Sequence, residues 1–208
     1  MKNLKGLSSN YLFGNLCKKN LIMRFLILLL FLPLKGITQL SFETIKMSKS
    51  VEETSGLEIL GNYLITHNDS GDKPKLYIIN QEGEKIMEIE LNQLKNKDWE
   101  DIAADSENYY IADTGNNYGT RENLKIYILD KDFFLQGKIS IRYQSQTTFS
   151  RELKNKYDAE ALAVVGDHLV LFSKNRKTLK SEIYSFPKVA GDYVLTPKAV
   201  IDSDALIT

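Results

Sequence analysis

The stretch from Thr54 to Asn80 decides the fold, because its parts recur twice further along the chain. It holds an opening TSGL, a strand-like run YLIT, a turn DSG and a second strand-like run LYIIN. The same order returns as WEDIA, YYIA, DTG and KIYILD between Trp99 and Asp130. It returns again as AEALA, LVLF, SKN and EIYSF between Ala159 and Phe186. A repeated supersecondary unit is therefore the first feature to explain.

Short runs of β-branched, aromatic and leucine residues between turn signals predict strands throughout this body. The run from Lys85 to Leu91 alternates apolar and polar residues, as a half-buried strand does. The rival helical stretch, Leu91 to Trp99, is short and rich in lysine, so we interpret it as a connection. We expect an all-β chain with strands at 63–66, 76–79, 85–91, 109–112, 125–129, 138–143, 169–172 and 182–186.

The spacing of the repeats favours a β-propeller. Ser55, Glu100 and Glu160 occupy matching places, 45 and 60 residues apart. Propeller blades have four strands and repeat at about 40 to 50 residues before loop insertions are added. A sandwich or barrel with coincidental turn similarity is the alternative, but its strands would not usually share an opener and a turn in register. We expect about three blades, near residues 53–91, 98–143 and 157–201.

The last residues, Asp202 to Thr208, look like the opening of another repeat. A propeller closes its ring with roughly four to eight blades. Three blades would leave unpaired strand edges and exposed core. We therefore expect either a fragment of a longer protein, which we favour, or copies that assemble to complete the ring.

The N-terminal region predicts export. Three basic side chains lie within residues 18–24, an apolar run covers 25–34, and the small residues Gly36 and Thr38 follow. These are the parts of a secretory signal, whereas a membrane-spanning helix needs about 20 apolar residues. We expect a signal peptide with an upstream extension over residues 1–38, with translation starting at Met1 or Met23. The mature domain, 39–208, would be secreted or periplasmic, without a stable membrane anchor.

Composition limits the class of partner. The chain has 27 basic and 27 acidic residues, so nothing suggests a surface for nucleic acid. Its 11 tyrosines and 9 phenylalanines against 4 prolines favour strands over disorder. The only cysteine, Cys17, precedes the apolar run, so disulfides cannot hold the mature fold together. We expect an extracellular protein or a small-molecule ligand as the partner, and no nucleic acid.

Acidic residues at matching places predict a metal site. The inner strands of a propeller line its channel, so Glu100 and Glu160 would converge there. Carboxylate oxygens are hard ligands suited to Ca²⁺ or Mg²⁺. Asp69 and Asp113 would add donors near the strand ends, although Asp-Ser-Gly and Asp-Thr-Gly are also good turn sequences. We expect Glu100, Glu160, Asp113 and Asp69 as metal ligands and a divalent cation such as Ca²⁺ as the cofactor.

Four neighbouring residues are candidates for ligand binding. Asp101 and Asn117 offer further oxygen donors, and His67 ends a strand where it could face the channel mouth. Trp99, between two acidic residues, could stack on a ligand, with packing between blades as the alternative. The sequence has no G-x-S-x-G elbow, P-loop, dinucleotide fingerprint or C-x-x-C pair. It therefore indicates a binding set without a recognisable catalytic set.

Motifs along the chain resemble a known group of proteins. ETSGL at 53–57, THNDSG at 66–71 and DWEDIA at 98–103 together resemble secreted, six-bladed propeller-like proteins of the Bacteroidetes. DTGNN, LKIY and YDAEAL, between 113 and 162, strengthen the resemblance. More distantly, the pattern is similar to the six-bladed superfamily of gluconolactonase-type lactonases and SdiA-regulated proteins. The resemblance implies six blades in the complete protein, with Glu100 and Glu160 at the place of a metal-binding glutamate in the lactonases.

Two functions from different classes remain open. The first is an exported, non-catalytic propeller that binds a ligand or protein, with calcium structuring its channel. The second is a divalent-metal-dependent hydrolase of small esters, lactones or phosphate esters that uses Glu100, Glu160 and Asp113. The repetitive pattern favours the first.

Overall fold

The structure is a computed structural model that describes residues 43–202 and 204–206. The expected signal peptide and both candidate start residues lie outside the described residues. The described residues from 44 onward form one compact unit, and the fold below is that of this unit. It has thirteen strands and one short 3₁₀ turn, Lys49–Val51, so the expectation of an all-β chain is confirmed. None of the described helical residues forms a helix long and apolar enough to cross a membrane.

The first sheet is a four-stranded antiparallel meander in chain order. Tight turns connect the first strand to the second and the third to the fourth, and in these turns Gly61 and Gly83 have φ of 61° and 81°, a backbone conformation that favours glycine. Its strands are β1 (Thr54–Leu60), β2 (Tyr63–Asn68), β3 (Lys75–Ile79) and β4 (Lys85–Glu90).

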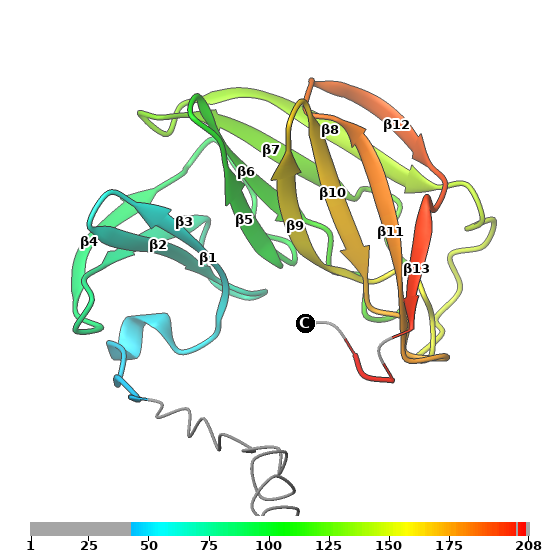
Figure 1. Cartoon of the computed structure of the whole chain (residues 1–208), viewed down its shortest axis with the longest axis horizontal. Coiled ribbons are helices and arrows are strands. Elements are labelled where there is room, and N and C mark those ends of the chain that lie inside the picture. The colour runs from blue at the N-terminus through cyan, green and yellow to red at the C-terminus, as the bar shows by residue number, and fades with distance from the viewer. Residues whose placement is uncertain (1–42, 203, 207–208) are drawn as a thin grey trace, which may run out of the picture. The chain divides into compact units, whose positions relative to one another are not determined.

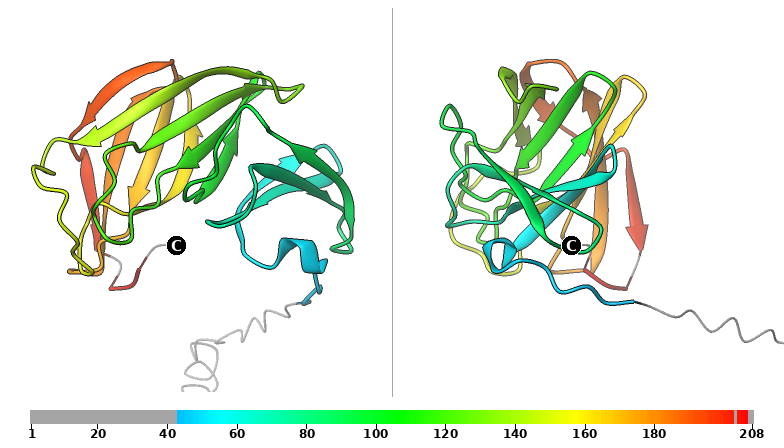
Figure 2. Two further views of the ribbon diagram at one scale, coloured as in Figure 1. Left: turned by 180° about the vertical axis from the view of Figure 1, so that it is seen from behind. Right: turned by 90° about the vertical axis from the view of Figure 1, so that its left-hand side faces the viewer.

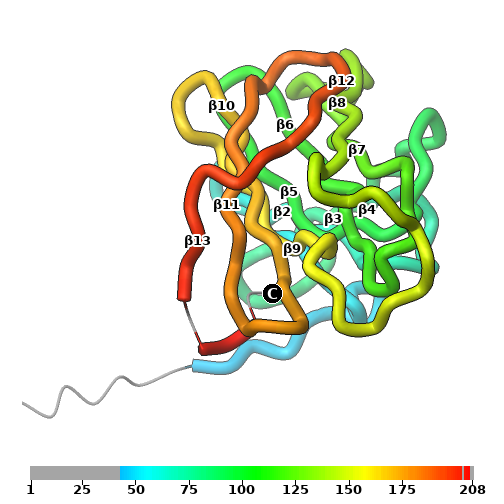
Figure 3. The backbone as a smooth tube through the Cα atoms, turned by 90° about the vertical axis from the view of Figure 1, so that its right-hand side faces the viewer, coloured from blue at the N-terminus to red at the C-terminus, as the bar shows by residue number. Residues whose placement is uncertain are grey.

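The second sheet repeats this meander and gains a fifth strand from later in the chain. Four antiparallel strands follow chain order, and β12 then pairs with β8 in parallel, for example Tyr193 with Ile141. Figure 3 shows β12 running beside β8. The strands are β5 (Asp101–Ala104), β6 (Asn108–Asp113), β7 (Lys125–Asp130), β8 (Leu135–Tyr143) and β12 (Gly191–Leu195).

The third sheet has the same antiparallel order, with its last strand taken from beyond β12. Its strands are β9 (Ala159–Val165), β10 (His168–Ser173), β11 (Lys180–Pro187) and β13 (Ala199–Asp202). The chain therefore leaves this sheet after β11, contributes β12 to the second sheet, and returns for β13.

The three sheets stand one after another, and their first strands are neighbours. β1 lies beside β5, and β5 lies beside β9 (Figures 1 and 2). One apolar core, including Ile65, Trp99 and Ile111, joins the first sheet to the second. Another, including Ile139, Leu169 and Tyr184, joins the second to the third. This stacking brings the beginnings of β1, β5 and β9 together at one end of the sheets.

The eight predicted strand runs all fall within observed strands, except that β4 ends at Glu90, one residue before the predicted end. Leu91 to Trp99 is a connection, as expected, since no regular element covers it. Two of the three openers, expected only as motifs, lie within strands β1 and β9, and the other runs into β5 from Trp99 and Glu100, which precede this strand. The described residues form separate sheets and no closed ring, so the propeller and its number of blades stay predictions.

Candidate metal centre

Each sheet has the same backbone hydrogen bond, in which a residue just before the first strand accepts from a residue just after the second strand. The three hydrogen bonds run from the amide of Asp69 to the carbonyl of Glu53 (2.9 Å), from Gly115 to Asp98 (3.2 Å), and from Lys174 to Asp158 (2.7 Å). Counting two residues on from each acceptor leads to Ser55, Glu100 and Glu160. The sequence match among these three is therefore also a structural match.

An irregularity in β9 sets the direction of the Glu160 side chain. Ala159 pairs with Ser173 and Ala161 pairs with Phe172, which leaves Glu160 as an extra residue in the strand. β1 has a similar shift between Thr54 and Leu57. Bulges of this kind turn a side chain away from the regular alternation and are common beside functional sites.

Five carboxylates meet at this end of the sheets in two groups of three. In the first group, ligand atoms of Asp69, Asp98 and Glu100 lie within 4.8 Å of one another. In the second, atoms of Glu100, Asp158 and Glu160 satisfy the same limit. Glu100 belongs to both groups. Since all the donors are carboxylate oxygens, the set suits a hard divalent cation.

Where the structure describes the chain, direct ion pairs with basic side chains lie on one side of this cluster, and on the other side the charge of Arg121 acts on Asp98 without an ion pair. Lys174 Nζ lies 3.0 Å from Glu160, and Arg176 Nη2 lies 2.8 Å from Asp158. Among the described residues, no lysine or arginine forms an ion pair with Asp69, Asp98 or Glu100. Glu100 is only 5% exposed, and no lysine or arginine in the described part of the chain neutralises its carboxylate in an ion pair. Buried acids normally have such partners, so the first group has unmet charge.

The pKa values of the cluster respond to this environment. Burial raises the pKa of Glu100, and the neighbouring charges of Glu160, Asp69, Asp98 and Asp158 raise it further. Burial followed by the charge of Asp158 raises the pKa of Glu160. Burial followed by the charge of Asp69 raises that of Asp98. The cluster therefore either retains protons at neutral pH or gains from a cation that neutralises it.

Gly115 leaves the space that the carboxylates occupy. A Cβ atom added there would lie far inside van der Waals contact with Oε1 of Glu100 and with the carboxyl group of Asp98. Gly115 stands at the place that Asp69 occupies in the first sheet and Lys174 in the third. The second sheet thus has no side chain at the position where the other two sheets carry a charged one, and the carboxyl groups of Glu100 and Asp98 occupy that space.

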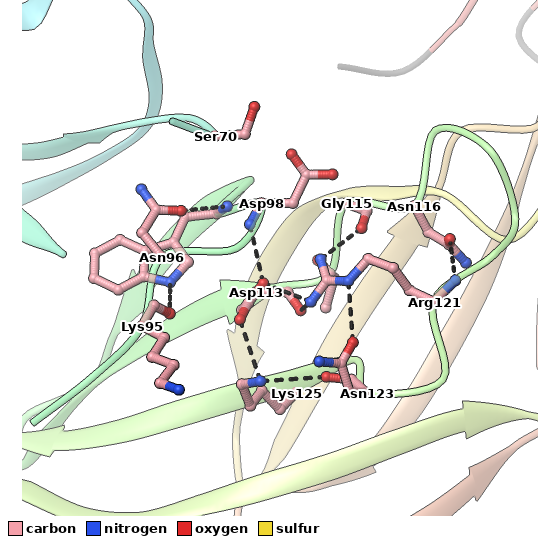
Figure 4. Close-up of polar contacts among 12 residues, drawn as sticks. Ser70, Lys95, Asn96, Asp98, Asp113, Gly115, Asn116, Arg121, Asn123 and Lys125 are labelled. Carbon is pink, nitrogen blue, oxygen red and sulfur yellow. Dashed lines mark hydrogen bonds and ion pairs between the residues drawn. The ribbon is translucent and has the colours of Figure 1, made fainter. Parts of the chain in front are cut away.

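Asp113 lies outside both groups. Its buried carboxylate contacts Arg121 Nη2 at 2.7 Å and Lys125 Nζ at 3.4 Å, and it accepts a bond from the Asp98 amide at 3.2 Å. Figure 4 shows the Asp98 side chain directed away from Asp113 and towards Ser70. The backbone links explain the difference: Gly115, two residues after Asp113, is the structural counterpart of Asp69.

The four residues predicted to bind a ligand do not form one site, because two are buried in the core, one links two strands and one is exposed. His67 and Trp99 are fully buried and pack edge to face, with ring centroids 5.6 Å apart. Burial lowers the pKa of His67 despite backbone hydrogen bonds that oppose it. Asp101 accepts the Leu162 amide at 2.7 Å and so links β5 to β9, while burial raises its pKa to about 6. Asn117 is exposed and accepts a hydrogen bond from Arg176.

A polar cavity of about 560 Å³ opens beside the first carboxylate group. Asp98 and Asn117 lie on its wall, so one acid of the cluster and one predicted ligand-binding residue face the same space. The remaining lining is Ser70, Lys97, Asn116, Tyr118, Thr120, Arg121, Leu153 and Arg176.

The sequence prediction missed Asp98 and Asp158. Both stand two residues before a predicted ligand, in Asp98-Trp-Glu100 and Asp158-Ala-Glu160. Residues two apart in an extended chain share a face, so the recurrence of D-x-E was a signal that could have found them. Arg176, from the third repeat, had no comparable signal.

No protein-family model matches the chain. No curated protein is detectably similar to it either. The resemblance to Bacteroidetes propellers therefore stays a prediction based on motifs.

Proposed function

We propose that this chain is an exported β-propeller module that binds a hard divalent cation, Ca²⁺ in the first place, and presents a ligand-binding surface beside it without catalysing a reaction. The observation that carries the proposal is the convergence of Asp69, Asp98, Glu100, Asp158 and Glu160 from three sheets. No cation within the described residues pairs with the first three of these.

The sheet arrangement supports the propeller. Each sheet is built on four antiparallel strands, and the first strands of successive sheets lie side by side. Propeller blades have this form, with their first strands nearest the central axis. Under this proposal the three sheets are blades, and the carboxylates lie at one end of the channel.

The donor set favours Ca²⁺ over Mg²⁺. Ca²⁺ accepts six to eight oxygen ligands in flexible geometry, whereas Mg²⁺ requires a near-ideal octahedron and retains several waters. Five carboxylates in two overlapping groups supply many oxygens, which suits the larger coordination number of Ca²⁺. A bound Ca²⁺ would offset the repulsion that raises the pKa values of Glu100, Glu160 and Asp98.

Binding is favoured over catalysis by the position of the nearest histidine. His67 is fully buried against Trp99, so its imidazole does not reach the cavity as a general base would have to. The other histidine, His168, pairs with Asp167 in a hairpin turn.

Calorimetric titration with Ca²⁺ and Mg²⁺ tests the proposal. We expect Ca²⁺ to bind more tightly than Mg²⁺, and Glu100→Gln or Glu160→Gln to weaken Ca²⁺ binding by about 100-fold or more, since each removes a charged ligand. Glu107→Gln, in the exposed β5–β6 turn, is the matched control. Absence of binding, or equal binding by Glu100→Gln and the control, would overturn the proposal.

One observation favours a second candidate, a metal-dependent hydrolase. Asp98 belongs both to the first carboxylate group and to the cavity wall, so a cation bound there would face a space large enough for a small ester. Esters, lactones and phosphate esters should be screened with Ca²⁺, Mg²⁺ and Mn²⁺. Turnover that Glu100→Gln abolishes would establish the hydrolase; cation binding without turnover of any of the three classes would reject it.

A further inference from the structure

We infer that the cavity beside the carboxylate cluster binds a small ligand through an oxyanion, a carboxylate or a phosphate. This inference rests on the proposed function, because a bound cation is needed to neutralise the acids on one side of the cavity. It adds the chemical class of the ligand, which the cation site alone does not define.

Three cationic side chains from separate segments line the cavity. Lys97 lies before β5, Arg121 before β7, and Arg176 between β10 and β11. Lys97 is exposed, and no described residue forms an ion pair with it. Oxygen and amide groups complete much of the wall, among them Ser70, Asn116, Asn117 and Thr120. Such a wall suits a polar, negatively charged ligand.

Arg121 is held in place before any ligand arrives. Its Nη1 donates to the Gly115 carbonyl at 2.6 Å, its Nη2 to Asp113 Oδ1 at 2.7 Å, and its Nε to Asn123 at 3.3 Å. Figure 4 shows the guanidinium surrounded by these acceptors. Only 9% of its side chain is exposed. One Nη1 proton is not used by these bonds, so Arg121 can orient a ligand without moving.

Arg176 retains more free donors. Its Nη2 contacts Asp158 at 2.8 Å and also Asn117. Its Nε is buried and has no hydrogen-bond partner in the described residues, and no acceptor there bonds to its Nη1. A buried donor without a partner is unfavourable, so this position favours a ligand that supplies an acceptor. An oxyanion oxygen that accepts from Nε would satisfy this donor, and Nη1 offers a second, separate contact.

The loop between β6 and β7 gives this wall a fixed frame. The Asn116 amide donates to Asp158 Oδ1 at 2.7 Å, and Asn116 Oδ1 accepts the Arg121 amide at 2.9 Å. Asn155 Nδ2 also donates to the Asn117 carbonyl at 3.0 Å. The arginines therefore lie on a wall braced by the third sheet, with Asp98 beside them. A ligand oxyanion placed between the arginines and a cation at Asp98 would contact both.

Ligand titration of the Ca²⁺-loaded protein tests the inference. The probes are phenyl phosphate, benzoate and the neutral benzyl alcohol, which share a ring and differ in the charged group. We expect one or both anions to bind and the alcohol not to. Phosphate preference and carboxylate preference are then distinguished by comparing the two anions.

Variants separate the inference from the proposed function. Lys97→Gln removes one charge from the wall and should weaken anion binding about 5-fold, a typical effect of one partly exposed charge. Arg176→Gln should weaken it more than 10-fold. Lys138→Gln, exposed on β8, should have no effect. Ca²⁺ is titrated into each variant first, so that loss of the cation is not mistaken for loss of the anion site.

The outcomes are distinct. If the wild type binds Ca²⁺ but neither anion, or binds benzyl alcohol equally well, the inference is wrong and the proposed function stands. Unchanged anion binding by a Lys97→Gln variant that retains Ca²⁺ also overturns it. If Ca²⁺ does not bind, both fail together.

Discussion

The two ends of β5 place acidic side chains in contrasting surroundings. Before the strand, Asp98 and Glu100 meet Asp69, Asp158 and Glu160 without a cation of their own. After it, Asp105 accepts hydrogen bonds from Lys188 Nζ at 2.7 Å, from the Tyr110 hydroxyl at 2.9 Å and from the amides of Glu107 and Asn108 at 2.8 Å. These groups are separated by only a four-residue strand.

The pKa shifts follow the surroundings. For Asp105, burial alone would raise the pKa, but the bonds from Lys188 and the two amides outweigh it and hold the pKa well below its usual range. For Glu100, burial and like charges act together and raise the pKa. The comparison teaches that the chain surrounds Asp105 with donors where this acid fastens two sheets, and leaves Glu100 without an ion pair where a cation from solution is the expected partner.

The largest expected effect is on the free energy of unfolding as a function of pH, which should fall both towards high pH and towards low pH. Groups whose pKa is raised on folding hold protons that the unfolded chain releases, so the free energy of unfolding falls as pH rises above the usual Glu pKa of about 4.3. One such proton corresponds to about 1.4 kcal/mol per pH unit. Asp105, with its lowered pKa, stabilises above its usual pKa of about 3.9, and this contribution is lost as pH falls further.

Urea unfolding in chelator from about pH 3 to pH 8 measures both slopes. Glu100→Gln should flatten the decline above pH 5, and Asp105→Asn should flatten the decline below pH 4. A wild-type curve that is level above pH 5 would contradict the electrostatic account of the cluster.

The second-largest effect is expected from removing Asp105, the acid at the end of β5 that is surrounded by donors. Asp105→Ala leaves Lys188, the Tyr110 hydroxyl and two amides without their acceptor, so we expect a loss of about 3 kcal/mol in the free energy of unfolding. Ca²⁺ affinity should be unchanged, because Asp105 is remote from the cluster. Thermal unfolding at neutral pH and calorimetry provide the two readouts, and Glu107→Ala in the same turn is the control. A large fall in Ca²⁺ affinity would show that the two ends are not independent.

The smallest effect is expected on Ca²⁺ affinity when a side chain is added at Gly115. Gly115→Ala places a methyl group against Glu100 and Asp98, so these side chains must shift. We expect Ca²⁺ affinity to fall about 10-fold, which is about 1.4 kcal/mol. Gly71→Ala is a useful comparison, because nothing lies near its added Cβ, although its φ of 91° is strained. Equal Ca²⁺ affinity in Gly115→Ala and wild type would show that the close packing of the carboxylates is not required.

Much of the fold could be predicted because each strand is marked locally. Runs such as Tyr109–Ala112 and Lys125–Leu129 carry their own pattern and turn signals, and the strands appear where those signals stand. β12 is different. Its parallel pairing with β8 joins residues about 50 positions apart, such as Asp192 and Ser140, and no local pattern encodes such a pairing.

The site could be predicted in part for the same reason. Glu100 and Glu160 were found because they match in the repeat, and the structure brings them together. Asp113 was aligned with Asp69 by its turn sequence, but the backbone bond that defines the position is made by Gly115 instead. Sequence similarity between turns therefore gave a register two residues away from the structural one. The pairing of Asp113 with Arg121 depends on a loop path that the sequence does not reveal.

The exchange of β12 between sheets has a consequence for how the protein opens. Because the chain passes from β11 in the third sheet to β12 in the second and back to β13, neither sheet can detach without breaking hydrogen bonds of the other. Amide protons of β8 and β11 should therefore exchange with solvent as one cooperative unit. The first sheet shares no strand with the others, and its amides should exchange in a separate, earlier event. A cation held by Asp69 together with Glu100 would connect the two units and slow that earlier exchange.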